Sequence, residues 1–293
     1  MVAMLDKAHR ATLRRIDAWA STINDRRASI AVTVEAALAM DLVLSMIGKV
    51  SPYVVVRFFT TADGKKKRKN DALKNSIGHR HGRAFGGCAD STPSCESACY
   101  VDAVLNLYKA VSAVLLRNLS IISALSTEDH WQDLSAKYVV LLRKSLKAQQ
   151  RVGVAVPIFR WHWSGDVINE WHARAIAHAA AQVPDLQQWI YTRSFFALPI
   201  LCEARNMRVL FSADRDNAAI ANTVRSLYSD VQIAWLDDDA KRTYNDDALV
   251  CPASKQVNVV SNPRSASGNS GICAKCLACV TAKKKRDIVF PIH

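Results

Sequence analysis

The fold is decided by residues 207–235, MRVLFSADRDNAAIANTVRSLYSDVQIAW. Two short runs in this stretch, residues 207–211 and 231–235, are rich in β-branched and aromatic side chains and predict strands. Residues 217–228 lie between them and have a helical pattern. A strand, a helix and a further strand within about 30 residues are typical of the βαβ unit of a parallel sheet.

The same alternation extends toward the amino terminus. Val152-Gly-Val-Ala-Val-Pro-Ile-Phe159 is almost continuously apolar, which predicts a strand buried on both faces. Residues 167–181 predict a helix, residues 189–191 a strand and residues 195–205 a helix. We therefore predict an α/β fold, built as a compact or incomplete (β/α) barrel with parallel strands.

The composition divides the chain into three regions. Residues 1–50 are rich in Ala, Leu, Arg and Glu and predict a helical N-terminal extension. Residues 51–250 are expected to form the barrel-like domain, which includes a long helix over residues 128–150. Residues 251–293 are expected to form a Cys-rich, metal-binding tail that packs on the barrel.

Charged and aromatic side chains follow each predicted strand, where parallel α/β folds place their functional groups. These residues are Arg160, Trp161, His162, Trp163 and Asp166 after the first of these strands, Tyr191 and Arg193 after the second, and Asp214 and Asp216 after the third. Either Asp166 or Asp214 could instead cap the helix that follows it, and His162 could be a buried structural histidine. Arg193 follows a buried strand, which favours contact with a phosphate or a carboxylate.

The chain is basic, with a formal net charge of +13 over 293 residues. This charge favours a polyanionic partner, most simply nucleic acid, although it also fits a solvated basic surface. The run Lys65, Lys66, Lys67, Arg68 and Lys69 is a candidate phosphate contact. Neither a signal peptide nor a membrane span is predicted, since the most apolar segment, residues 30–47, contains two acidic residues. We expect a soluble, cytoplasmic protein.

The tail holds one of two cysteine groups. Its members are Cys251, Cys273, Cys276 and Cys279, and His293 follows them. Two-residue gaps between thiols are typical of metal ligands that converge from a tight turn. Three thiolates and the imidazole would suit zinc. Cys251-Pro252 together with the closely spaced run is similar to a ferredoxin arrangement and would suit an iron–sulfur cluster.

The second group consists of Cys88, Cys95 and Cys99, in a loop that also contains Gly86 and Gly87. Its gaps are wider than those in the tail. These thiols could be three ligands of a cluster such as [4Fe–4S], or three ordinary buried cysteines.

These motifs occur together in one order along the chain. They are Thr92-Pro93-x-Cys95-x3-Cys99-Tyr100, Phe159-Arg-Trp-His-x-Ser-Gly-Asp166, Tyr191-Thr-Arg193, Phe211-Ser-Ala-Asp214, Cys251-Pro252, the Cys-x-x-Cys-x-x-Cys run and Phe290-Pro-Ile-His293. In this combination the chain resembles the gene product 88 family of actinobacterial phages and mobile elements, over about residues 70–293. The resemblance implies a phage-type protein that acts in the host-cell cytoplasm.

The strand-end aspartates and the tail are also similar, more distantly, to tRNA-guanine transglycosylases and their phage DNA-modifying relatives. That similarity implies exchange of guanine for a 7-deazaguanine in DNA, with a structural zinc in the tail. The catalytic candidates are Asp166, Asp214 and His162, where one aspartate attacks the sugar and the other manages protons. Arg160, Arg193 and the run from Lys65 to Lys69 would hold phosphates, and Trp161, Trp163 and Tyr191 would stack an extruded base.

Two other functions stay open. A similarity to phage proteins of the radical S-adenosylmethionine type implies an iron–sulfur enzyme that uses S-adenosylmethionine. In that case Cys88, Cys95 and Cys99 would be the cluster ligands, and the tail would hold a second cluster. The third possibility is a DNA-binding protein without enzymatic activity, in which the zinc is structural and the aspartates are caps.

Overall fold

The computed structural model describes residues 77–102, 109–151, 153–237, 248–251, 276–281 and 286–291. Several predicted features lie outside the described residues. They are the helical extension over residues 1–50, the run from Lys65 to Lys69, Cys273 and His293.

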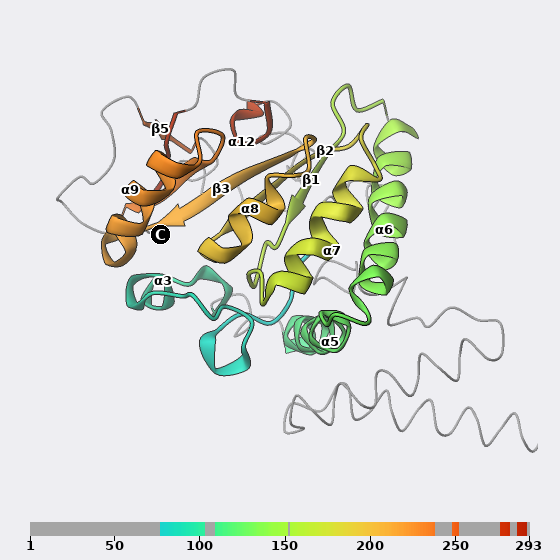
Figure 1. Ribbon diagram of the computed structural model, residues 1–293, viewed down its shortest axis with the longest axis horizontal. Coiled ribbons are helices and arrows are strands. Elements are labelled where there is room, and N and C mark those ends of the chain that lie inside the picture. The colour runs from blue at the N-terminus through green and yellow to red at the C-terminus, as the bar shows by residue number, and fades with distance from the viewer. Residues whose placement is uncertain are drawn as a thin grey trace, which may run out of the picture.

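The described residues form an α/β fold around a curled half-barrel of six strands (Figure 1). The strands are β1 (Ile158–Trp161), β2 (Gln187–Thr192), β3 (Met207–Ala213), β4 (Gln232–Asp237), β5 (Leu249–Val250) and β6 (Ile288–Pro291). Their order across the sheet is β1-β2-β3-β4-β6-β5, and every neighbouring pair is parallel. The prediction of an incomplete barrel with parallel strands is therefore confirmed.

Helices cover the outer face of the half-barrel. They are α6 (Trp131–Arg151), α7 (Glu170–Ala181), α8 (Leu198–Leu201) and α9 (Ala218–Leu227) (Figure 1). Outward side chains of the strands, such as Phe159, Phe211 and Trp235, are buried in the main hydrophobic core together with helix residues. No helix in the described part of the chain combines the length and the apolar character that a membrane span needs.

The inner face of the half-barrel is also covered. The short helix α12 (Ala278–Thr281) lies against β2 and β3. Its Val280 is buried with Ile158, Trp189 and Leu210, which point away from the main core. Burial on both faces explains why these strands are almost continuously apolar in sequence.

The first of these strands begins later than its apolar run predicts. Helix α6 continues to Arg151, and Gly153 then adopts a left-handed conformation with a φ of 72°. The amides of Gly153 and Val154 donate to the last carbonyls of α6, as in a glycine-terminated helix. Residues 153–157 are thus a helix cap and a connection, and the prediction of a strand from residue 152 is wrong.

Part of the tail belongs to the sheet. Strand β6 lies between β4 and β5, and Trp235 of β4 is in register with Val289 of β6. Asp287, which precedes β6, accepts a hydrogen bond from Trp235 Nε1 at 2.8 Å and also pairs with Arg225 of α9. Residues 288–291, assigned to the tail from the sequence, are therefore a strand of the half-barrel.

Candidate functional site

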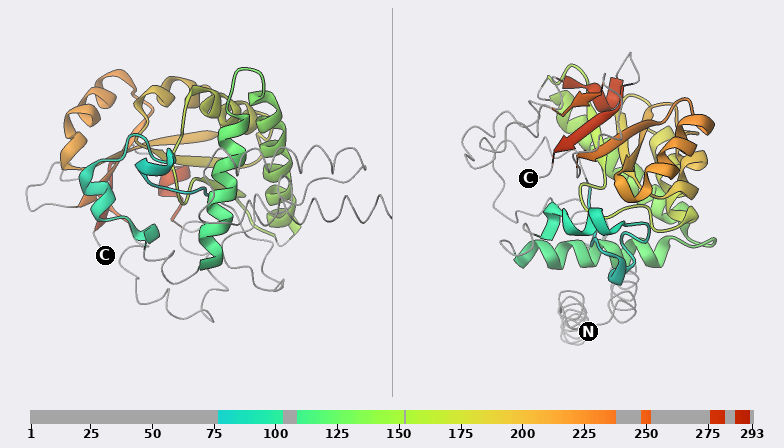
Figure 2. Two further views of the ribbon diagram at one scale, coloured as in Figure 1. Left: turned by 90° about the horizontal axis from the view of Figure 1, so that it is seen from below. Right: turned by 90° about the vertical axis from the view of Figure 1, so that its left-hand side faces the viewer.

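Residues 77–102, which we call the cysteine segment, run past the carboxyl ends of β1, β2 and β3. This segment contains η3 (Arg83–Phe85) and α3 (Pro93–Ser97), and its carboxyl-terminal part precedes α5 (Lys109–Leu125). Figure 2 shows the segment beside α5 and below the sheet in the right-hand view, and the Asn118 side chain of α5 donates to the Gly78 carbonyl at 2.7 Å. The segment is thus fixed between the sheet edge and a helix.

Backbone hydrogen bonds join the cysteine segment to the residues that follow the strands. The amide of His79 donates to the Ser164 carbonyl at 2.9 Å, and the amide of Asp166 donates to the Gly87 carbonyl at 2.7 Å. Farther along the segment, the Ser94 amide donates to the Asp216 carboxylate at 2.8 Å. Because Gly87 precedes Cys88 and Ser94 precedes Cys95, these bonds fix the backbone beside two of the cysteines.

The local sequence explains how α3 presents Cys95. Thr92 is the N-cap of α3, with its hydroxyl accepting a hydrogen bond from the Cys95 amide at 3.1 Å. Pro93 occupies the first helical turn, where its missing N–H costs nothing. The same Thr92 hydroxyl donates to the Asp214 carboxylate, which follows β3. This single side chain therefore connects the cysteine segment to the sheet.

The three thiols of the cysteine segment interact electrostatically with one another. All three are partly buried and none is in a disulfide. Burial raises the pKa of Cys88 to about 12, and the charges of Asp166, Cys95 and Cys99 act in the same direction. Burial is also the main cause of the raised pKa of Cys95 and of Cys99. The three groups are thus near enough to interact electrostatically, and they are neutral thiols at neutral pH when no metal is bound.

A buried ion pair lies beside Cys95. Arg193, which follows β2, places Nη1 2.6 Å from Oδ2 of Asp214, and the two side chains are 10% and 0% exposed. The guanidinium also opposes the effect of burial on Cys95, because its charge and a hydrogen bond lower the pKa of that thiol. Arg193 is therefore placed to stabilise a thiolate at Cys95.

The two predicted catalytic aspartates both have structural partners. Asp214 is the N-cap of η5 (Arg215–Asn217), where it accepts a hydrogen bond from the Asp216 amide at 2.9 Å. The carboxylate of Asp166 is buried and accepts hydrogen bonds from the amides of Val167 and Arg193, both at 2.7 Å. The capping alternative is thus confirmed for Asp214 and wrong for Asp166, because Asn169 caps α7 and Asp166 instead connects the residues that follow β1 and β2.

We expect the contribution of Asp166 to stability to fall as the pH rises. Burial raises its pKa from 3.8 to about 6 in the folded protein. Between these pH values the unfolded chain has released the proton while the folded chain still holds it, so rising pH disfavours folding. An Asp166→Asn variant lacks this titration. The difference in unfolding free energy, wild type minus variant, should therefore decrease by up to about 3 kcal/mol between about pH 4 and pH 7 in urea denaturation. A difference independent of pH would contradict the raised pKa.

The predicted base-stacking residues lie in different places. Trp161 is completely buried in the main core and donates its indole N–H to Gln188 at 2.9 Å, which leaves no ring face for a base. Trp163 is partly exposed and packs over Gly78. Tyr191 lies on the inner face with the guanidinium of Arg160 5.2 Å from its ring centroid. The structure thus does not bring these three aromatic residues to one surface.

Two tail cysteines gather at Tyr191. The tyrosine hydroxyl donates to Cys279 Sγ at 2.9 Å, and burial, together with the charges of Cys279 and Cys251, raises the pKa of Tyr191 well above its usual value. Both cysteines pack against the inner-face core. Cys276 is exposed. The described part of the tail therefore places both Cys251 and Cys279 beside Tyr191.

Three further residues at this edge of the sheet have roles that were not predicted from the sequence. Thr92 is one of them, although a threonine followed by proline is a recognisable helix start. The others are His79 and His172, which both lie beside the buried His162. No spacing in the sequence relates these three histidines, because they come from separate parts of the chain.

Comparison with known proteins assigns the chain to a family. The family described as Gene product 88 matches residues 57–282, which is more than half of the chain. The chain belongs to the gene product 88 family. The resemblance inferred from the motifs is therefore confirmed, and the matched range of this gene product 88 protein includes Cys88, Cys95, Cys99, Arg193 and Asp214.

Two phage proteins are similar to this gene product 88 protein. The "Gene 88 protein" of Mycobacterium phage L5 is 29% identical over 223 residues, which cover 74% of this chain and 87% of that protein. The "Gene 88 protein" of Mycobacterium phage D29 is 29% identical over 219 residues, which cover 72% of this chain and 85% of that protein. No solved structure matches the chain.

Proposed function

We propose that this gene product 88 protein is an iron–sulfur enzyme of the radical type. Cys88, Cys95 and Cys99 would hold a [4Fe–4S] cluster that works with S-adenosylmethionine. The observation that carries the proposal is that these three partly buried thiols interact electrostatically beside the carboxyl edge of an incomplete parallel barrel. This edge is where barrels of parallel strands bind substrates and cofactors.

The donor set fits such a cluster. Thiolates are the ligands that iron–sulfur clusters take from proteins, and three of them leave one of the four irons open to another ligand. The guanidinium of Arg193 lies beside Cys95 and supports its thiolate form. Zinc would accept the same thiols, so the metal itself has to be measured.

The bound cofactors would supply chemistry that side chains lack. An iron–sulfur cluster bound by Cys88, Cys95 and Cys99 would, together with S-adenosylmethionine and an external reductant, supply one-electron radical chemistry. The chain would hold the site in place. Thr92 fixes Cys95 through the N-cap of α3, and Asp214 holds Arg193 beside it.

The two aspartates support this choice over base exchange. A transglycosylase needs one carboxylate that is free to attack a sugar. Asp214 is committed to the η5 cap and to Arg193, and Asp166 to two backbone amides. We therefore place the chemistry at the thiols and give the aspartates a positioning role.

Nucleic acid is the substrate class that we propose, with DNA first. The net charge of +13 would attract a polyanion and raise its association rate. We also propose that the tail cysteines, which include Cys251 and Cys279 at Tyr191, bind a second metal centre.

Iron analysis of anaerobically purified protein tests the proposal. We expect brown protein with about four irons and four sulfides from the cysteine segment, and more if the tail also holds a cluster. Cys88→Ala, Cys95→Ala and Cys99→Ala should each lose the iron of the segment, whereas Cys202→Ala should keep it, since Cys202 is exposed and stands apart from both groups. With dithionite and S-adenosylmethionine, only the wild type and Cys202→Ala should release 5′-deoxyadenosine. Colourless protein that contains only zinc would contradict the proposal.

A further inference from the structure

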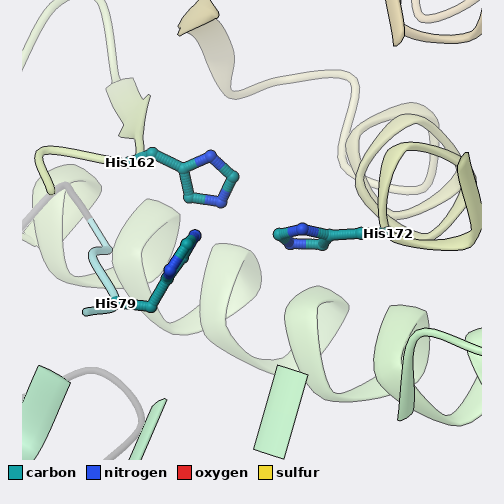
Figure 3. Close-up of side chains that lie close together, drawn as sticks. All are labelled: His79, His162 and His172. Atoms are coloured by element: carbon teal, nitrogen blue, oxygen red, sulfur yellow. The ribbon is translucent and has the colours of Figure 1, made fainter. Parts of the chain in front are cut away.

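Three histidines from separate parts of the chain face one another (Figure 3). His79 belongs to the cysteine segment, His162 follows β1 and His172 lies in the first turn of α7. One ring nitrogen of each lies within 4.8 Å of the corresponding nitrogens of the other two. All three side chains are buried.

His162 has an unusual backbone and an unusual side-chain environment. Its φ is 52°, in the left-handed region that residues other than glycine seldom adopt. Its side chain is 3% exposed, and neither ring nitrogen has a hydrogen-bond partner among the described residues. A buried polar group without a partner is costly, and strained backbone is often found where a ligand site requires it.

Both ring nitrogens of His79 lie near backbone carbonyl oxygens, which can only accept hydrogen bonds. Its Nε2 lies 2.8 Å from the Asp166 carbonyl and its Nδ1 3.2 Å from the Arg80 carbonyl. Burial lowers the pKa of His79 to about 4, so the ring is neutral and carries a single N–H. When that N–H is on Nε2 and donates to the Asp166 carbonyl, Nδ1 carries a lone pair. The Arg80 carbonyl cannot donate to this lone pair, which can bind a cation instead.

His172 also keeps one nitrogen with a weak contact. Its Nε2 lies 2.9 Å from the Tyr138 hydroxyl, and its Nδ1 accepts only a long contact from the Ile168 amide at 3.3 Å. Metal-binding histidines generally donate their second N–H to a carbonyl, a carboxylate or another oxygen, which fixes the ring. The Asp166 carbonyl and the Tyr138 hydroxyl provide this support for His79 and His172.

We propose that His79, His162 and His172 bind one Zn²⁺ ion. Three neutral imidazoles are a common protein ligand set for this ion, and the nitrogens need to move together by only about 1 Å or less to reach zinc–nitrogen distances of about 2.0–2.1 Å. The ion would bind one nitrogen of His162, which has no hydrogen-bond partner among the described residues, and Nδ1 of His79. At His172 it would replace the long contact from the Ile168 amide to Nδ1.

The zinc site would fix the position of the cysteine segment. His79 and Cys88 lie on the same segment, and Asp166 is hydrogen-bonded beside each of them. Its carbonyl contacts Nε2 of His79, and its amide donates to the carbonyl of Gly87, which precedes Cys88. An ion held by His79 from the segment, His162 from the sheet edge and His172 from α7 would fix these three elements together. The role is structural, and it does not depend on which metal the cysteines bind.

Zinc analysis and X-ray absorption of the full-length protein test this site. After loading with excess zinc and removal of unbound metal, the wild type should contain about one more zinc per chain than His162→Asn, and its spectrum should include zinc with three nitrogen neighbours at about 2.0–2.1 Å, distinct from zinc–sulfur distances of about 2.3 Å. Asparagine is chosen because it tolerates a positive φ. His172→Gln should show the same loss.

The matched control is His178→Asn. His178 is also in α7, but its ring contacts Ser135 at 2.8 Å and lies outside the cluster. This variant should keep the zinc content and the nitrogen shell of the wild type. A wild-type spectrum with sulfur neighbours alone would overturn the proposal without reference to any variant. Equal zinc content in the wild type and in folded His162→Asn would overturn it as well.

Discussion

Replacing Arg193 with methionine is expected to lower the free energy of unfolding by about 3–5 kcal/mol. The guanidinium lies 2.6 Å from Asp214, and neither side chain is more than 10% exposed. Methionine keeps much of the side-chain length but removes the charge, so the Asp214 carboxylate would stay buried without its cation. Removing one member of a buried pair is far more costly than removing both. Urea denaturation at neutral pH measures the difference.

Two further variants separate this effect from a general loss of packing. Arg215 forms an ion pair with Asp216 at 3.8 Å, and its side chain is 57% exposed. Arg215 Nε also donates to Ser94 Oγ at 3.0 Å. Because water screens exposed pairs and competes for exposed hydrogen bonds, Arg215→Met should cost only about 1 kcal/mol. A double variant, Arg193→Met with Asp214→Asn, should recover part of the stability lost in Arg193→Met. Similar losses for Arg193→Met and Arg215→Met would show that the buried pair is not important for stability.

Gly87→Ala is expected to disrupt the cysteine segment. A Cβ atom at this position would lie 1.7 Å from the Arg80 carbonyl oxygen, so the backbone itself would have to move. Gly87 precedes Cys88, and its carbonyl holds the Asp166 amide at 2.7 Å. We expect the free energy of unfolding to fall by about 3 kcal/mol, which is in the upper part of the usual range for overpacked sites. We also expect a fall in iron bound per chain.

The neighbouring glycine provides the control. Gly86 has a φ of 71°, but a Cβ atom there would meet nothing within 4 Å. Gly86→Ala should therefore lower the free energy of unfolding by only about 1 kcal/mol, because one alanine must adopt a left-handed conformation. It should leave the iron content unchanged. Equal effects of the two substitutions on stability and iron would contradict the close approach of Gly87 to Arg80.

Local sequence pattern was enough to predict most of the parallel sheet. Residues 207–211 lie in β3, and residues 232–235 of the predicted run 231–235 lie in β4, since apolar runs of this length flanked by helical patterns fit a sheet covered on both faces. The start of β1 was wrong because Gly153 ends α6 inside an apolar run. Strand β6 was missed because its four residues, Ile288–Pro291, lie in a segment dominated by possible metal ligands.

Only those residues of the candidate site that follow the strands could be predicted from the sequence. Arg193 and Asp214 follow β2 and β3, and the rule that functional groups follow parallel strands identified both. Their partner Thr92 lies 122 residues from Asp214 in sequence, and no local pattern indicates such a contact. The cluster of His79, His162 and His172 could not be predicted for the same reason. The fold brings the three rings together, and no spacing in the sequence indicates it.

The position of β6 has a consequence for how this protein is made. The ribosome produces β6 after the five other described strands, yet β6 belongs between β4 and β5. Until it emerges, β4 and β5 each present an edge with unpaired amides and carbonyls to the crowded cell, and such edges pair readily with other chains. The sheet therefore cannot be completed until β6 has left the ribosome, and any factor that delays this step prolongs the period in which the nascent chain is prone to aggregate.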